Sequence, residues 1–117
     1  MENNGWKIFK GAFNFGYKLT TKAGSFAIDQ IKKNLDNHKY RESINSAKSL
    51  GEPDRTLIIV EIVSFWKKNP ELQFSDDIIN AVNIITEPSR TNELRSLVAL
   101  FASKKMNNAV KKVSSLL

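Results

Sequence analysis

The sequence predicts an all-α fold of five to six helices, in which two 35-residue helical hairpins stack and amphipathic helices flank them. Three observations lead to this prediction. The pentapeptide Glu-Pro-Asp-Arg-Thr at 52–56 returns as Glu-Pro-Ser-Arg-Thr at 87–91. Residues 42–68 aligned with 77–103 at this offset of 35 give seven identities. Apolar residues around both pentapeptides recur at steps of three and four, which is the spacing of one helix face.

Each copy is expected to contain a short amphipathic helix, a Glu-Pro joint and a second amphipathic helix. Proline disfavours helix in the residue before it and suits the first helical position, so Pro53 and Pro88 are expected to begin the second helices. The apolar positions expected in the core are Ile44, Ala47, Leu50, Ile59, Ile62, Val63 and Trp66 in the first copy, and Ile78, Val82, Ile85, Leu94, Leu97, Val98 and Phe101 in the second.

The joint residues have a structural interpretation and a binding one. These residues are Glu52, Pro53, Arg55, Thr56, Glu87, Pro88, Arg90 and Thr91. We expect each arginine to pair with a nearby glutamate or with a carbonyl of a neighbouring helix, and a ligand role is the alternative.

The period of 33 to 35 residues with two helices per unit is the size of common α-solenoid repeats. The agreement is in size alone, because the sequence patterns of tetratricopeptide and ankyrin repeats are absent. Two interpretations therefore stay open. The hairpins either form a true internal repeat with a solenoid-like core, or belong to a compact bundle whose two similar joints arose independently.

The chain length of 117 residues suits a single domain, expected to span 1–117 with the two hairpins over 40–103. Before them, a helix is expected over 25–35, preceded by a basic, aromatic segment over 1–24. In that segment a lysine face lies opposite a broad aromatic face. This pattern is compatible with packing onto the core, with contact to an anionic membrane or a partner, or with an extended arm. The candidate membrane or partner surface is Trp6, Lys7, Phe9, Lys10, Phe13, Tyr17, Lys18 and Lys22.

The last segment, 104–117, is expected to form a basic amphipathic helix. Its apolar face would contain Met106, Val110, Val113 and Leu117. The lysines on the opposite face form a candidate basic patch of Lys104, Lys105, Lys111 and Lys112. The purely structural interpretation is a solvated terminal helix that covers the edge of a core.

No catalytic, cofactor-binding or metal-ligating residues are expected. Cysteine is absent and His38 is the single histidine, so a structural zinc site is excluded and a catalytic triad would depend on this one imidazole. His38 lies in a polar stretch that suits a turn between helices. Asp76 and Asp77 suit a helix N-terminus, where their charges favour the helix dipole. The glycines match no phosphate-binding loop.

Charge is unevenly distributed: +4 over 1–39, −2 over 40–78 and +4 over 79–117, which sum to the net +6. The favoured function is a non-catalytic helical module that binds a protein partner, of the adaptor, immunity or inhibitor type, oriented by its basic ends and acidic centre. One alternative is a peripheral protein held on an anionic membrane by its N-terminal segment, and another is a nucleic-acid-binding helical domain. No segment is long and apolar enough to span a bilayer. The expected location is cytoplasmic, with membrane association as the alternative.

Overall fold

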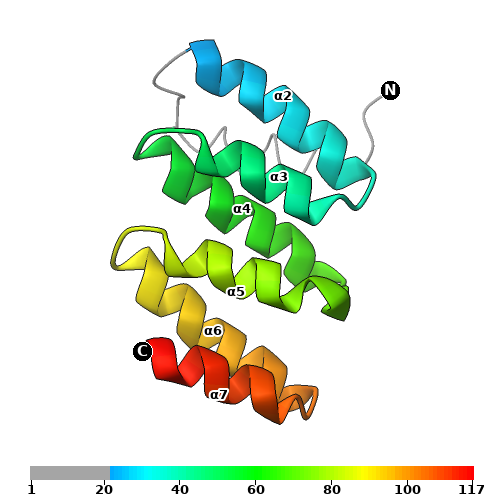
Figure 1. The fold of residues 1–117 in the computed structure, drawn as a ribbon, viewed down its shortest axis with the longest axis vertical. Helices are drawn as coiled ribbons and strands as arrows, with labels where there is room; N and C mark the ends of the chain where they lie inside the picture. The colour runs from blue at the N-terminus through cyan, green and yellow to red at the C-terminus, as the bar shows by residue number, and fades with distance from the viewer. Residues whose placement is uncertain (1–21) are drawn as a thin grey trace. The chain divides into compact units, whose positions relative to one another are not determined.

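The structure is a computed structural model that describes the backbone of residues 22–117 and the side chains of residues 28–117 (Figure 1). Within residues 22–117 it contains six α-helices, one 3-10 helix and no strand. The predicted all-α class is confirmed for this part of the chain. The chain divides into two compact units with the boundary between Pro70 and Glu71, called here the N-terminal and C-terminal units. The expectation of a single domain stays a prediction.

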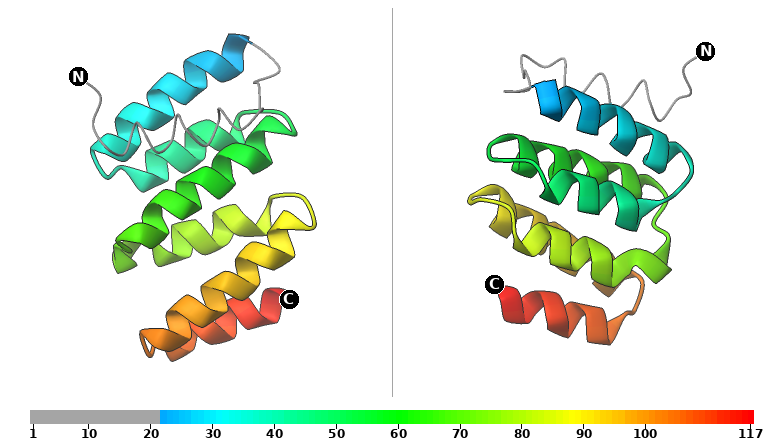
Figure 2. Two further views of the ribbon diagram at one scale, coloured as in Figure 1. Left: turned by 180° about the vertical axis from the view of Figure 1, so that it is seen from behind. Right: turned by 45° about the horizontal axis from the view of Figure 1, so that its top comes forward.

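The N-terminal unit contains α2 (Lys22–Asp36), α3 (Tyr40–Lys48) and α4 (Asp54–Lys68). Helix α3 packs against both α2 and α4 (Figures 1 and 2). The hydroxyl of Ser43, buried on α3, donates a hydrogen bond of 3.3 Å to the Ile31 carbonyl of α2. The buried apolar residues of these helices are Ile28, Ile31, Leu35, Tyr40, Ile44, Ala47, Ile58, Ile59, Ile62, Val63 and Trp66.

The C-terminal unit contains the 3-10 helix η1 (Leu72–Phe74) and the helices α5 (Ser75–Asn83), α6 (Ser89–Ser103) and α7 (Asn107–Leu116). Helix α6 packs against α5 and α7, and these two short helices also contact each other (Figures 1 and 2). The buried apolar residues of the helices and their turns are Ile78, Ile79, Ala81, Val82, Ile85, Leu94, Leu97, Phe101 and Val113.

The helices on either side of the two pentapeptides have matching bounds. Helices α3 and α5 are nine residues long and begin 35 residues apart. Helices α4 and α6 are fifteen residues long and also begin 35 residues apart. The predicted helix–joint–helix order is therefore present in both units.

The two joint prolines lie one residue outside their helices, which corrects the prediction that they begin them. Pro53 and Pro88 are N-cap residues with nearly equal backbone angles, φ −86° and ψ −1° against φ −84° and ψ −2°. Each proline carbonyl accepts the first helical hydrogen bond, from Leu57 N–H at 3.2 Å and Asn92 N–H at 3.1 Å, which is the behaviour of an N-cap residue. The Glu52–Pro53 and Glu87–Pro88 peptide bonds are both cis.

Helices α2 and α6 end in the same left-handed turn. His38 and Lys105 have φ of 58° and 59°. In the second turn the N–H of Met106 donates to the Phe101 carbonyl at 2.9 Å and that of Lys105 to Ala102 at 3.0 Å. These bonds satisfy last-turn carbonyls in the pattern of a Schellman motif. The polar turn predicted around His38 is thus confirmed.

The expected C-terminal helix over 104–117 starts three residues too early. Lys104 and Lys105 lie in the turn after α6, because the positive φ of Lys105 is incompatible with a right-handed helix. The last member of the apolar face is also different. Leu117 is 57% exposed, whereas Leu116 is half-buried at a spacing of three from the buried Val113.

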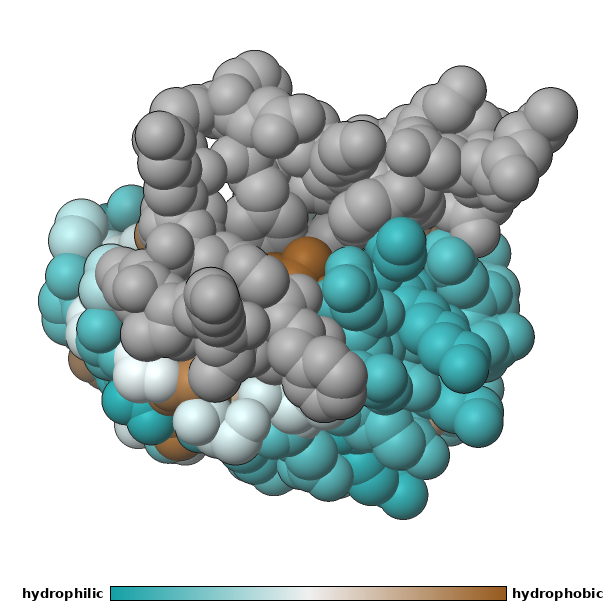
Figure 3. Space-filling model, turned by 90° about the horizontal axis from the view of Figure 1, so that it is seen from above, coloured by the Kyte–Doolittle hydropathy of each residue, from teal (hydrophilic) through white to brown (hydrophobic). Residues whose placement is uncertain are grey.

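All the apolar positions predicted for the two hairpins are buried except one. Val98 of α6 is half-buried, whereas its counterpart Val63 in α4 is fully buried. Asp76 and Asp77 lie in the first turn of α5, as predicted. The coloured surface visible in Figure 3 is mainly hydrophilic, with small hydrophobic areas, as expected where helices turn polar faces outward.

Two adjacent residues of α4 provide a test of which face of this helix is buried. Ile58 is fully buried and Leu57 is exposed. The change Ile58→Ala is expected to lower the free energy of unfolding by about 2–5 kcal/mol, because it removes buried methylene groups and leaves a cavity. The change Leu57→Ala removes a side chain of the same size from the surface and is expected to cost less than about 1 kcal/mol. Urea denaturation of both variants is the measurement. Equal losses of unfolding free energy would contradict the burial of Ile58 and the exposure of Leu57.

Candidate functional site

In the first joint a glutamate side chain caps the helix that follows it. Pro53, at the N-cap, has no side-chain oxygen to accept a free N–H of the first turn. The carboxylate of Glu52 accepts the Thr56 N–H at 2.9 Å and the Thr56 hydroxyl at 2.9 Å. It also pairs with Nε of Arg55 at 3.3 Å. Glu, Arg and Thr of the pentapeptide therefore form one local network at the start of α4.

The second joint repeats this network. The carboxylate of Glu87 accepts the Thr91 N–H at 2.9 Å and pairs with Nη1 of Arg90 at 3.3 Å. Both arginines thus pair with the glutamate three residues earlier, as predicted. The Glu, Arg and Thr that both pentapeptides share are explained by capping chemistry, because they bind one another inside each joint.

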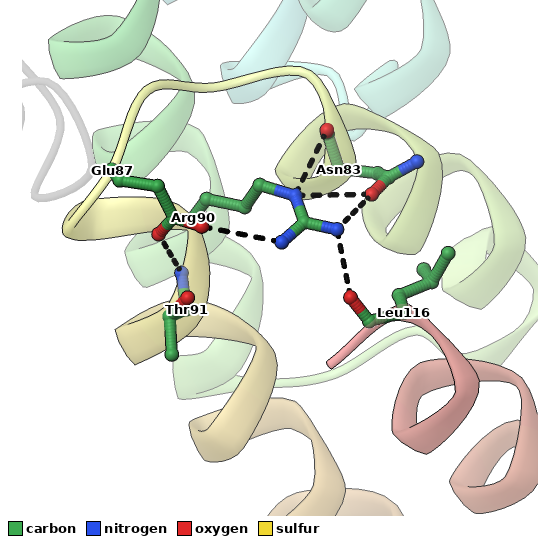
Figure 4. A network of polar contacts seen from close by, with 5 residues as sticks. All are labelled: Asn83, Glu87, Arg90, Thr91 and Leu116. Carbon is green, nitrogen blue, oxygen red and sulfur yellow. Dashed lines mark hydrogen bonds and ion pairs between the residues drawn. The ribbon is translucent and has the colours of Figure 1, made fainter.

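Arg90 makes further bonds, to the ends of two helices (Figure 4). Its Nη2 donates to Asn83 Oδ1 at 2.8 Å and to the Leu116 carbonyl at 2.8 Å. Its Nε donates to Asn83 Oδ1 at 3.2 Å and to the Asn83 carbonyl at 3.3 Å. Asn83 and Leu116 are the last residues of α5 and α7, where carbonyls have no intrahelical partner. One guanidinium therefore joins the ends of two helices to the joint.

The same networks lower the pKa of both glutamates. Burial by itself raises the pKa of Glu52, but the hydrogen bonds from Thr56 and the hydrogen bond and charge of Arg55 outweigh it, so the pKa lies below its ordinary value of 4.5. The pKa of Glu87 is lowered chiefly by the hydroxyl and backbone N–H of Thr91, which outweigh the opposing effect of burial, and the hydrogen bond and charge of Arg90 lower it further. In each joint the ionised carboxylate is the form that the network stabilises.

The predicted basic patch lies on the C-terminal unit, and one of its members is already paired. Lys104, Lys105 and Lys111 are exposed, while Nζ of Lys112 lies 3.1 Å from a carboxylate oxygen of Asp76 in α5. This exposed ion pair links α7 to the first turn of α5. The three other lysines leave the patch with a positive charge, and no acidic residue follows Glu93 in the sequence.

A surface hollow of about 290 Å³ lies beside this patch. Its apolar lining includes Leu72, which is 39% exposed, and the half-buried Met106. The full lining is Leu72, Gln73, Ser75, Asp76, Met106, Asn108, Ala109 and Lys112. The surface of α7 and of the turn before it thus combines exposed cations with a small recess whose lining is partly apolar.

The other predicted sites have different outcomes. The residues from Trp6 to Lys18 on the candidate membrane or partner surface lie outside the described residues, and Lys22 is described only as the first backbone position of α2. Trp66 is fully buried, so it belongs to a core and not to an exposed binding anchor. No helix among residues 22–117 is long and apolar enough to cross a membrane. No group of three or more potential metal-ligating side chains gathers in the described part of the chain.

Sequence reasoning missed the partners that lie far away in the chain. Asn83 and Leu116 join Arg90 from other helices, and Asp76 joins Lys112 across 36 residues. The sequence signal for Leu72 was a single leucine in a polar stretch after Pro70, which does not distinguish a recess from a loop.

No protein-family model, curated protein or solved structure matches this chain.

Arg90→Ala tests the contribution of the Arg90 bonds to Asn83 and Leu116, at the ends of α5 and α7. We expect the free energy of unfolding to fall by about 1–2 kcal/mol, because charge-assisted bonds to Asn83 and Leu116 are lost. Arg90→Lys should recover only part of this loss, since an ammonium cannot reproduce the fork of donors. Urea denaturation is the measurement. Arg95→Ala removes an exposed arginine from the same helix and is the control. Equal losses of unfolding free energy at positions 90 and 95 would argue against a stabilising role for these bonds.

Acid stability tests the capping glutamate of the first joint. Because the folded-state pKa of Glu52 is lowered, its contribution to stability is complete above its ordinary value of 4.5 and is lost as the pH falls through the folded pKa. Glu52→Gln is therefore expected to destabilise the protein at neutral pH. Below pH 4.5 the stability of this variant should fall less with decreasing pH than that of the unchanged protein. Thermal unfolding measured across this pH range checks the result. Glu42→Gln on the exposed face of α3 controls for removal of a carboxylate elsewhere, and a matching change in that variant would refute the assignment to the joint.

Proposed function

We propose that this chain is a non-catalytic helical module that binds a protein partner through the surface of its C-terminal unit. The observation that carries the proposal is the surface of α7 and of the turn before it. Lys104 and Lys105 of the turn and Lys111 of α7 are exposed beside a recess with Leu72 and Met106 in its lining. Protein interfaces commonly place an apolar contact inside a polar, charged rim, and methionine is enriched in them. A positive rim favours a partner with an acidic surface.

The proposal includes the two hairpins as copies of one structural repeat that stack in a solenoid-like manner. It is supported by the equal lengths of the paired helices, by their constant offset of 35 residues and by the identical capping of both joints. Repeat proteins of this kind bind partners along surfaces built from successive units.

A photo-cross-linking amino acid at position 108, within the lining of the recess, tests the proposal in the native host. The expected product is a cross-link to a protein, with much less product from the same group at position 95 on the exposed face of α6. Charge reversal by Lys105→Glu and Lys111→Glu should reduce the yield, because it replaces attraction to an acidic partner with repulsion.

The alternative functions are opposing outcomes of the same experiment. Cross-links to nucleic acid that vanish steeply with salt would favour a nucleic-acid-binding domain. Cross-links to lipid would favour a membrane-surface protein, whose predicted anchor is the basic, aromatic segment over 1–24. Equal yields from positions 95 and 108 would overturn the proposed surface.

A further inference from the structure

A second hollow adjoins the recess beside α7. It has a volume of about 470 Å³ and is lined by Lys105, Met106, Asn107, Asn108 and Ala109. Met106, Asn108 and Ala109 also line the recess of about 290 Å³, so the two hollows lie next to each other at the start of α7. Together they are called here the α7 groove. All of its described lining residues belong to the C-terminal unit.

The described lining of the α7 groove combines apolar and amide side chains. Leu72 is 39% exposed, and Met106 and Ala109 are half-buried, so a partner that covers them removes apolar surface from water. An amide side chain both donates and accepts hydrogen bonds, which suits the N–H and C=O groups of a peptide. The exposed amide side chains of this lining are Gln73, Asn107 and Asn108.

The charge around the α7 groove is mainly positive. Lys105 and Lys112 belong to its lining, and their sequence neighbours Lys104 and Lys111 are exposed. Asp76 is the one acid among the described lining residues, and its carboxylate lies 3.1 Å from Nζ of Lys112. Both side chains of this pair are exposed, so a carboxylate of a partner can replace Asp76 at small cost.

Charge makes segments of this chain poor occupants of the groove. The N-terminal unit, residues 1–70, contains twelve Lys and Arg against seven Asp and Glu, which gives +5. A second copy of the chain brings a net charge of +6. Charge complementarity therefore favours an acidic segment of another protein. Nucleic acid is also a poorer match, because no described lining residue is aromatic and could stack on a base.

We propose that the α7 groove binds a short acidic segment of the partner protein. An apolar side chain of the segment enters each hollow, its carboxylates lie at the surrounding lysines, and its main chain pairs with the amide side chains of the lining. The inference rests on the proposed function, because it concerns the same surface, and it adds the chemistry that the partner presents there.

The full chain, isotope-labelled for NMR, is titrated with capped peptides of Asp, Glu, Ser and Gly that contain two leucines. The leucines are placed about two to four residues apart, which covers extended and helical segments. The salt concentration is about 0.15 M, so that distant charges are screened. We expect saturable shifts of the amide signals of Asn107, Asn108 and Ala109. A peptide of equal charge with serine at both leucine positions should bind at least about tenfold more weakly, because it cannot fill the hollows.

Two pairs of variants test the groove itself. Leu72→Ser should weaken binding of the leucine peptide about fivefold. Leu57→Ser removes a leucine of nearly equal exposure, 38% against 39%, from α4 and should leave binding unchanged. Asp76→Asn should strengthen binding about two- to fivefold, because it removes a like charge and releases Lys112. Glu42→Gln removes an exposed carboxylate from α3 and should have no such effect.

Several results would overturn the inference. One is the absence of saturable shifts with every leucine peptide. Another is equal binding of the leucine and serine peptides, which would indicate charge attraction alone. A third is a thymidine oligonucleotide or an anionic phospholipid vesicle that shifts the same signals at lower concentrations than the peptides. Equal effects of Leu72→Ser and Leu57→Ser would also exclude the groove as the binding site.

The titration and the cross-linking at position 108 can fail separately. A protein cross-link at position 108 without peptide binding would overturn the acidic segment and leave the proposed function supported. Peptide binding with the expected variant effects, but without any protein cross-link in the native host, would support the ligand class of the groove and count against the proposed function.

Discussion

The hydrogen bond from a first-turn N–H to the carboxylate of the preceding glutamate is the interaction on which both joints depend. A helix that begins behind an N-cap proline lacks the usual serine, threonine or aspartate oxygen at that position. Glu52 and Glu87 supply this acceptor from one residue earlier, both at 2.9 Å. The threonine and the arginine of each pentapeptide then bind the same carboxylate, so five consecutive residues contain the whole capping network at the start of α4 and of α6.

The two joints share the capping by glutamate and differ in the bonds that their arginines make. In the C-terminal unit, Arg90 extends the cap to the last residues of α5 and α7 and so ties three helices together. In the N-terminal unit, Arg55 bonds to Glu52. At the position that matches the acceptor Asn83, the first joint has Lys48.

Local sequence was a good guide wherever short-range chemistry decides the outcome. The helices on both sides of each pentapeptide, the pairing of each arginine with its glutamate and the burial of Trp66 all followed from spacing and residue type. Apart from Val98 in the middle of α6, the errors lie at helix ends. Lys105 was expected in the last helix because its spacing puts it on the face opposite the apolar residues. The positive φ that excludes it from a helix belongs to the turn that closes α6.

The sequence by itself determined the all-helical class, the apolar faces and the local network of each joint, because these depend on side chains within about one helical turn of one another. Only the tertiary structure decided that Leu116 meets Arg90, that Asp76 pairs with Lys112 and that Leu72 contributes to a recess beside α7. These contacts join residues from separate elements. Their formation depends on how α5, α6 and α7 pack, and the spacing of residues along one helix does not predict that packing.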